Sequence, residues 1–245
     1  MTGPVTTAVR ELAGRRPLLV ASDYDGVLAR LRDAPGEAVP EPWALDLLRR
    51  LAAADGVTVA LVSGRGVEDL RTTSGFGEPF RFVGSHGAET DAGLDPAVAA
   101  ERDLLVEALG PLVEAVEGAR LEVKPAAVAV HVRTVVDRAA ATALLERAAA
   151  AAGPHHTAKP GKDVLELAVT DADKGTAVRR LAEELGADGV LYLGDDVTDE
   201  DAFRALAADG TTVKVGDGET AAQLRVADLD GVRDLLTDLA AALEG

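Results

Sequence analysis

The sequence predicts an α/β fold in which a doubly wound parallel sheet is interrupted by a smaller α+β insert. A short apolar run ends abruptly in Asp23, Asp25 and Gly26, as a buried parallel strand does. Strand-like and helix-like segments then alternate, which favours βαβ units. Between the third and fourth strands of this alternation, the order changes to a helix followed by two adjacent strands, and this order occurs twice.

The first part of the chain has the order βαβαβ. Its first strand is the apolar run that begins at Leu18. Residues 43–54 place Leu45, Leu48 and Leu51 at helical spacing, so they fit an amphipathic helix. The remaining elements are a strand at 57–62, the start of a helix at 66–72 and a strand at 80–83.

The insert follows, at residues 89–169. Helices are expected at 96–117 and 135–152, and the strands that follow them at 121–124, 128–132, 155–158 and 164–168. Successive strands are close enough in sequence to pair as antiparallel hairpins. The order αββαββ therefore predicts an inserted second domain at 89–169, while residues 1–88 and 170–245 form the core domain.

The doubly wound alternation returns at Asp173. The segment Asp173, Lys174 and Gly175 opens a helix that runs to residue 184. The remaining elements are a strand at 189–193, a helix at 202–208, a strand at 212–215 and a helix at 231–243. They complete the predicted core.

Composition excludes several classes of function. The 245 residues include 42 acidic and 25 basic side chains, and a net charge of −17 disfavours binding to nucleic acid or anionic membranes. The absence of cysteine excludes disulfides and thiolate chemistry. Residues 1–10 lack the apolar stretch of a signal peptide, and no apolar run reaches the roughly 18 residues of a membrane span. We expect a cytoplasmic monomer with a small-molecule substrate.

Polar residues follow the strands of the predicted core. They are Asp23, Asp25, Ser63, Lys174, Asp195, Asp196 and Asp199. The Asp-x-Asp-Gly turn alone is common at solvated strand ends, but the carboxyl ends of parallel strands meet at one edge, so the whole set should converge. So many carboxylates require a hard divalent cation, and all-oxygen ligation favours Mg²⁺. Mg²⁺, Lys174 and Ser63 can hold a phosphate group while a carboxylate attacks phosphorus.

The order and spacing of these residues resemble the haloacid dehalogenase superfamily, whose members are aspartyl-phosphate phosphatases. The resemblance implies that Asp23 is the nucleophile, Asp25 the general acid and base, Ser63 a phosphoryl ligand and Lys174 the neutralising cation. It implies Mg²⁺ ligation by the Asp23 carboxylate, the Asp25 carbonyl and the acidic motif of Asp195, Asp196 and Asp199. The expected fold is then a Rossmann-like core with a C2-type cap.

The residues between these motifs are similar to those of trehalose-6-phosphate phosphatases. The similar stretches are DYDGVL at 23–28, SGR at 63–65, GSHGAE at 84–89, KP at 124–125, HVR at 131–133, GK at 161–162 with Glu166, DKG at 173–175 and GDDVTDEDAF at 194–203. The resemblance covers both predicted domains. It implies a Mg²⁺-dependent phosphatase of trehalose 6-phosphate, in which the insert closes over the active site and binds sugar hydroxyls.

The same resemblance implies a set of substrate contacts. In the core they are Tyr24, Gly26, Gly64, Arg65, His86 and Glu89, and in the insert Lys124, His131, Arg133, Lys162 and Glu166. Selectivity among sugars requires such groups, because a phosphate clamp cannot distinguish one sugar phosphate from another. A lysine or arginine on an exposed strand is equally common as a solubilising residue, so the contacts in the insert have this alternative interpretation.

The sequence departs from the family pattern at two adjacent positions in the insert. Ala168 and Val169 stand where the family usually has an Arg-Pro pair. The change removes a positive charge from the insert but leaves the phosphatase residues in place. Three other substrates therefore stay open, namely sucrose phosphate, a glycosyl phosphoglycerate and a pseudo-disaccharide phosphate. A non-catalytic regulator that binds a sugar phosphate is a further alternative.

Overall fold

The protein consists of two compact units. The computed structural model describes residues 4–32, 35–153 and 156–245. The first unit is Met1–Asp91 with Ala172–Gly245, and the second is Ala92–Asp171. These boundaries lie close to the predicted ones at 88/89 and 169/170. In the described residues, no helix is long and apolar enough to cross a membrane.

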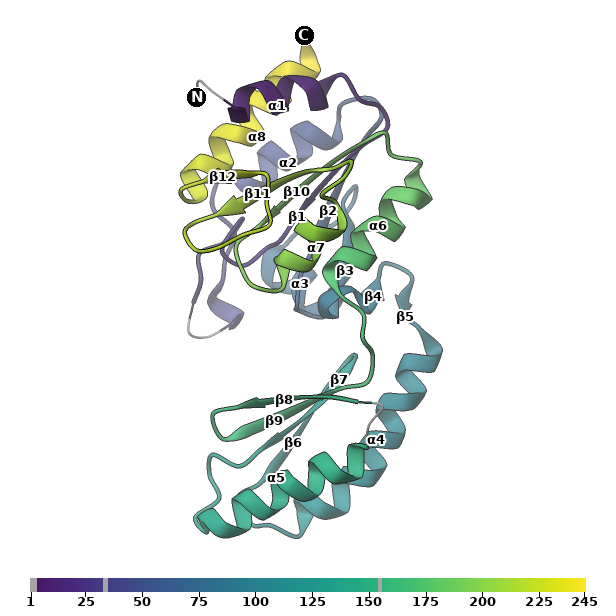
Figure 1. Ribbon diagram of the computed structural model, residues 1–245, viewed down its shortest axis with the longest axis vertical. Coiled ribbons are helices and arrows are strands. Elements are labelled where there is room, and N and C mark those ends of the chain that lie inside the picture. Colours follow the sequence, from purple (N-terminus) through teal and green to yellow (C-terminus); the bar gives the residue numbers. More distant parts are fainter. Residues whose placement is uncertain (1–3, 33–34, 154–155) are drawn as a thin grey trace. The chain divides into compact units, whose positions relative to one another are not determined.

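A mainly parallel sheet forms the centre of the first unit (Figure 1). Its strands are β1 (Leu18–Ser22), β2 (Val57–Val62), β3 (Arg81–Gly84), β4 (Glu89–Thr90), β10 (Gly189–Gly194), β11 (Thr211–Val215) and β12 (Leu224–Val226). They lie in the order β12-β11-β10-β1-β2-β3-β4, in which β4 is antiparallel to β3 and the other pairs are parallel. The strands that follow β1 in the chain are first added on one side of it (β2, β3 and β4) and later on the other side (β10, β11 and β12). The order therefore reverses between β1 and β10, and such sheets bind ligands at this switch point.

Helices cover both faces of this sheet (Figure 1). On one face lie α1 (Pro4–Ala13), α2 (Ala44–Ala52), α3 (Val67–Ser74) and α8 (Leu229–Glu244), and on the other α6 (Lys174–Leu185) and α7 (Asp199–Ala205). Leu18 and Val20 pack into the first layer, whereas Leu19 and Ala21 pack into the second. Because β1 is buried on both faces, its sequence is uninterruptedly apolar rather than alternating.

The second unit is a four-stranded antiparallel sheet with two helices on one face. After the short strand β5 (Gly93–Leu94), its elements are α4 (Pro96–Glu114), β6 (Arg120–Lys124), β7 (Ala127–His131), α5 (Arg138–Ala152), β8 (Thr157–Gly161) and β9 (Val164–Ala168). Val128 and Val130 of β7 pack against the helices, so Ala129 and His131 face the opposite side. The predicted α/β core and αββαββ insert are thereby confirmed.

Several boundaries differ from the predictions for local physical reasons. Helix α5 begins at Arg138 rather than at residue 135, because the Asp137 side chain caps it by accepting from the amides of Ala139 and Ala140. Strand β8 runs to Gly161 and contains Pro160, which an edge strand tolerates. The first residue of the strand predicted there, His155, lies outside the described residues.

We expect Leu109→Ala to destabilise the second unit by about 2–5 kcal/mol, because Leu109 is fully buried in its core and truncation leaves a cavity. Leu104 lies in the same helix and is 60% exposed. Leu104→Ala, the control, should change the free energy of unfolding by less than about 0.5 kcal/mol. Amide hydrogen exchange measures both effects, and an equal loss of protection in both units would contradict two separate cores.

Candidate active site

Three carboxylates gather at the carboxyl ends of β1 and β10. The two strands are parallel with Ser22 opposite Leu193, and the Asp23 amide continues the ladder by donating to the Leu193 carbonyl at 2.9 Å. This register brings Asp23 beside the turn that follows β10. Carboxylate oxygens of Asp23, Asp195 and Asp199 lie within 4.8 Å of one another. The predicted convergence of these three residues is therefore present.

Lys174 joins two of these carboxylates. Its Nζ donates to Asp23 Oδ2 at 2.7 Å and to Asp199 Oδ1 at 2.8 Å, and the side chain is buried. Lys174 is the first residue of α6, whose start is capped by the Asp173 side chain accepting from the Thr176 amide. Burial alone would lower the pKa of Lys174, but the carboxylates of Asp23 and Asp199 raise it above its usual value. Lys174 therefore stays charged.

Asp199 accepts four hydrogen bonds at the centre of this network. Oδ1 accepts from Lys174 and from the Tyr192 hydroxyl at 2.7 Å. Oδ2 accepts from the backbone amides of Asp195 and Asp196, both at 2.9 Å. Burial, followed by the charge of Asp199, raises the pKa of Tyr192, so its phenol keeps the proton that it donates.

The site carries more negative than positive charge. Burial raises the pKa of Asp23. The positive charge of Lys174 opposes this rise, and the negative charge of Asp199 adds to it. Burial and the carboxylates of Asp199 and Asp196 raise the pKa of Asp195 to about 6. Carboxylates under such repulsion favour a bound cation. The chemistry of the donors, clustered carboxylate oxygens, fits a hard divalent ion such as Mg²⁺.

Gly26 allows Asp195 to approach the turn after β1. Gly26 has a φ of +77°, and a Cβ at this position would lie 2.0 Å from Asp195 Oδ2. In the described part of the chain, no hydrogen bond is donated to the Asp195 carboxylate, although Lys214 donates to the Asp195 backbone carbonyl. Asp196, in contrast, is exposed and outside the cluster of three carboxylates. Asp195 is therefore the acid of this turn that is best placed for a metal.

Asp25 forms an ion pair with Arg65 and is not part of the cluster of Asp23, Asp195 and Asp199. Arg65 donates to Asp25 Oδ2 from Nε at 2.7 Å and to Oδ1 from Nη2 at 2.9 Å. It also donates to Asp69 at 3.0 Å, and its guanidinium lies 5.8 Å from the centre of the Tyr24 ring. Arg65 and Tyr24 were predicted as substrate contacts. In the structure Arg65 holds Asp25, while Tyr24 is fully buried and its hydroxyl donates to the Ala38 carbonyl.

The other predicted core residues lie in two adjacent segments, one after β2 and one after β3. The Ser63 hydroxyl accepts from the Arg65 amide at 3.2 Å, and the Ser63 carbonyl accepts from the His86 amide at 3.0 Å. A Cβ on Gly64 would lie 2.5 Å from the His86 ring, so Gly64 makes room for this side chain. Glu89 accepts from the Val67 amide and from Ser85. These residues therefore lie close together, and their predicted contacts with substrate stay predictions.

In the second unit, the predicted contacts separate into two groups. Lys124, His131 and Glu166 lie on the sheet face opposite α4 and α5. Lys124 pairs with Glu166, and His131 lies 2.6 Å from Glu122. The other two predicted contacts, Arg133 and Lys162, are exposed and lie in turns. We define the polar face of the second unit as Glu122, Lys124, His131, Lys159 and Glu166.

Sequence reasoning missed four residues of these networks. They are Tyr192 and Lys214 in the core and Glu122 and Lys159 in the second unit. Lys214 gives a signal, because a lysine within the apolar strand β11 must find a buried partner. Lys159 is opposite Glu166 in the strand register, which the sequence alone does not reveal.

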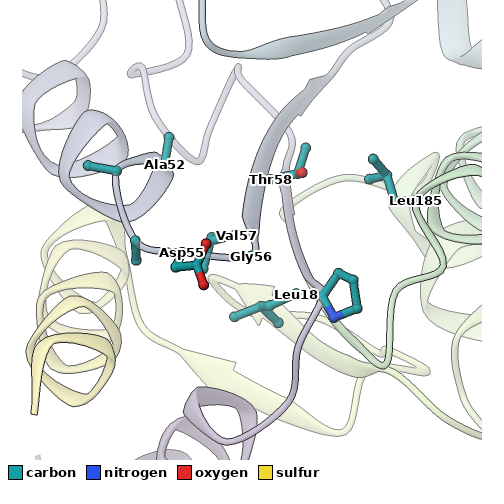
Figure 2. Close-up of a pocket in the computed structure, with 10 residues that line it drawn as sticks. Leu18, Ala52, Asp55, Gly56, Val57, Thr58 and Leu185 are labelled. Carbon is teal, nitrogen blue, oxygen red and sulfur yellow. The ribbon is translucent and has the colours of Figure 1, made fainter.

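A pocket of about 410 Å³ lies at the opposite ends of the strands from the carboxylate cluster (Figure 2). It is lined by the amino ends of β1 and β2 and the loop before β2, including Leu18, Asp55, Gly56 and Thr58, together with Leu185 of α6. Asp55 and Gly56 are exposed, and the Asp55 carbonyl already accepts from Arg16 at 2.9 Å. The pocket lies at the amino ends of the strands and the carboxylate cluster at their carboxyl ends, so the two are separate.

Comparisons with known proteins identify a family. A family profile described as trehalose-phosphatase matches residues 21–229. The bifunctional trehalose-6-phosphate synthase/phosphatase of Thermoproteus tenax is 36% identical over 93% of this chain and 32% of that protein. The trehalose-6-phosphate phosphatase of Escherichia coli is 32% identical over 91% of this chain and 86% of that protein. The chain thus spans about a third of the first relative and most of the second.

A solved structure extends the similarity to the fold. The trehalose-6-phosphate phosphatase of Aspergillus fumigatus superposes with a TM-score of 0.73 at 25% sequence identity. The superposition covers 98% of this chain and 98% of the fungal chain. Both units of the present protein therefore have counterparts in that structure.

We expect Gly26→Ala to weaken the binding of Mn²⁺, used as a probe for an oxygen-ligand site, by about tenfold or more. The added methyl group would displace the Asp195 carboxylate. Gly216→Ala is the matched control, because Gly216 has a φ of +80° but open space around its Cβ position. It carries the same backbone strain without the clash. Electron paramagnetic resonance of free Mn²⁺ gives both affinities, and equal losses would contradict the role of Gly26.

Proposed function

This chain belongs to the trehalose-phosphatase family, and we propose that it hydrolyses trehalose 6-phosphate to trehalose and inorganic phosphate. The observation that carries the proposal is the buried Asp23 carboxylate, held at the switch point of the sheet by Lys174. A carboxylate in this position can act as a nucleophile, because it is fixed in orientation and lies beside a permanent positive charge. A cytoplasmic location and a monomeric state stay predictions of the sequence.

Asp23 is the proposed nucleophile. Its Oδ1 accepts from the Tyr24 amide and its Oδ2 from Lys174, both at 2.7 Å, so the carboxylate plane is fixed. One carboxylate oxygen attacks phosphorus, the bond from phosphorus to the sugar oxygen breaks, and an aspartyl phosphate forms. Water then attacks this phosphorus and releases inorganic phosphate, which restores Asp23. Lys174 and the Ser63 hydroxyl hold the phosphoryl oxygens during both steps.

Asp25 is the proposed general acid and base. It gives a proton to the departing sugar alkoxide and later takes one from the attacking water. In the structure both oxygens of its carboxylate accept hydrogen bonds from Arg65. This pair must open before Asp25 can exchange a proton with the sugar oxygen or with water. Substrate entry beside Arg65 offers one way to open it.

Mg²⁺ is the proposed cofactor. The Asp23 and Asp195 carboxylates and the Asp25 carbonyl would hold it, and the first two are already within reach of a common ion. When bound, Mg²⁺ supplies positive charge that offsets the repulsion between the phosphate and the acidic site. The raised pKa values of Asp23 and Asp195 support this assignment, because burial, followed by repulsion from neighbouring carboxylates, disfavours their ionised forms unless a cation is bound.

The polar face of the second unit is the proposed sugar-binding surface. It combines carboxylates, ammonium groups and an imidazole, which suit a ligand with many hydroxyl groups. Between these groups lie the small side chains of Ala127 and Ala129. A related sugar phosphate is the second candidate substrate. It is favoured by Ala168, which lies on the same face where the family usually has arginine.

We expect the protein to release phosphate from trehalose 6-phosphate in preference to other sugar phosphates, and only when Mg²⁺ is present. Asp23→Asn should abolish the reaction, because an amide is not a nucleophile at phosphorus. Asp25→Asn should lower the rate about 10²–10⁴-fold with the sugar phosphate and far less with p-nitrophenyl phosphate, whose leaving group needs no proton. Phosphate release from a panel of sugar phosphates tests these expectations.

Each outcome of the panel has a distinct meaning. Turnover of sucrose phosphate or a glycosyl phosphoglycerate in place of trehalose 6-phosphate would support the second candidate. Full activity of Asp23→Asn would refute the proposed nucleophile. Stoichiometric binding of trehalose 6-phosphate without phosphate release would replace the enzyme by a binding protein.

We expect Glu166→Gln to lower kcat/KM for trehalose 6-phosphate about 10–100-fold and to leave hydrolysis of p-nitrophenyl phosphate nearly unchanged. The substitution removes the charge that holds Lys124 and orders the polar face. Glu107→Gln is the matched control, because Glu107 is exposed on α4, on the other side of the sheet. Equal losses with both substrates would contradict a role for Glu166 in sugar selectivity.

A further inference from the structure

The carboxylate of Asp199 has all of its acceptor positions in use. A carboxylate offers about four lone-pair positions, and Asp199 fills them with Lys174, the Tyr192 hydroxyl and two backbone amides. A metal ion could bind Asp199 only by displacing one of these donors from a fully buried position. The Asp195 carboxylate, by contrast, accepts no hydrogen bond within the described residues. The two acids of this turn therefore have different tasks.

Tyr192 is rigidly placed to hold Asp199. It lies in β10, is fully buried, and packs edge-on against Phe203 with ring centres 5.9 Å apart. Phe203 belongs to α7, the helix that begins at Asp199. The phenol therefore reaches Asp199 from the sheet, while the ring contacts the helix that carries Asp199. A movement of Tyr192 would therefore displace Asp199, and a movement of Asp199 would displace Tyr192.

The direction of the Lys174 side chain depends on the position of Asp199. A lysine side chain has a flexible stem and three donors, so its direction must be set by its partners. Two of the donors are directed to Asp23 and Asp199, at 2.7 and 2.8 Å. The third is left for a phosphoryl oxygen. The direction of that third donor follows from the position of Asp199.

We propose that Tyr192 is a positioning residue of the reaction, which acts through Asp199 to aim Lys174, and that Asp199 is a structural anchor rather than a metal ligand. The inference rests on the proposed phosphatase function and deepens it. It separates the metal site, centred on Asp195, from the lysine site, centred on Asp199.

Tyr192→Phe tests the proposal, because it removes one hydroxyl and keeps the ring. We expect kcat to fall about tenfold or more, since a small misplacement of a catalytic group lowers the rate strongly. KM and the dissociation constant of Mn²⁺, measured by electron paramagnetic resonance, should stay within about twofold. Thr212→Val is the control, because it removes a buried hydroxyl of the neighbouring strand that accepts from the Gln223 amide rather than from the lysine site. It should keep kcat within about threefold.

A double-substitution cycle distinguishes positioning from a general structural role. If Tyr192 acts through Lys174, Tyr192→Phe should have no further effect on the residual rate of a Lys174→Met variant. A full tenfold loss in that background would overturn the proposal, as would a tenfold weakening of Mn²⁺ binding by Tyr192→Phe. These results require an active wild-type protein. A wild-type protein that releases no phosphate would refute the proposed function instead, and the Mn²⁺ measurement would still test the assignment of Asp199.

Discussion

The structure of the first unit depends on one buried lysine that is shared by two carboxylates. Lys174 connects the turn after β1 to the start of α7 through Asp23 and Asp199, and all three side chains are almost or completely buried. Removal of one partner from such a group leaves a buried charge uncompensated and typically costs about 3–5 kcal/mol. The elements that supply them are therefore held in one relative position. Stability and chemistry require the same arrangement.

Glycines make this arrangement sterically possible. A Cβ on Gly194 would lie 2.3 Å from the Asp199 carboxylate carbon, and one on Gly175 would lie 2.4 Å from the Asp201 carbonyl. Gly26 leaves the same kind of space for Asp195. Each of these glycines stands next to or near an acid or lysine of the site in the sequence. The glycines of the motifs thus allow charged side chains and backbone to approach one another closely.

The sequence predicted the parallel sheet and the carboxylates at one of its edges because those features follow from burial along the chain. β1 is apolar throughout since it is covered on both faces, and the acids after it must lie at the carboxyl edge. Helix α1 was missed although Val5, Val9 and Leu12 lie at helical spacing, whereas strand β12 has only three residues, which are too few to set a period. Pairings such as Arg65 with Asp25 also depend on side-chain geometry, which spacing does not encode.

The two units differ in how easily their polar residues can be substituted by other residues. In the first unit, Asp199 holds a lysine, a tyrosine and two amides, so a substitution there would disturb several partners at once. In the second unit, Lys124 and Glu166 form a partly exposed pair on a sheet face whose opposite side carries the core. Exposed pairs contribute about 0–1 kcal/mol, so this face can change with little effect on stability. The absence of the usual Arg-Pro pair at Ala168 and Val169 is such a change. Under the proposed function, such a face could change the sugar that is accepted while the buried network of the first unit stays the same.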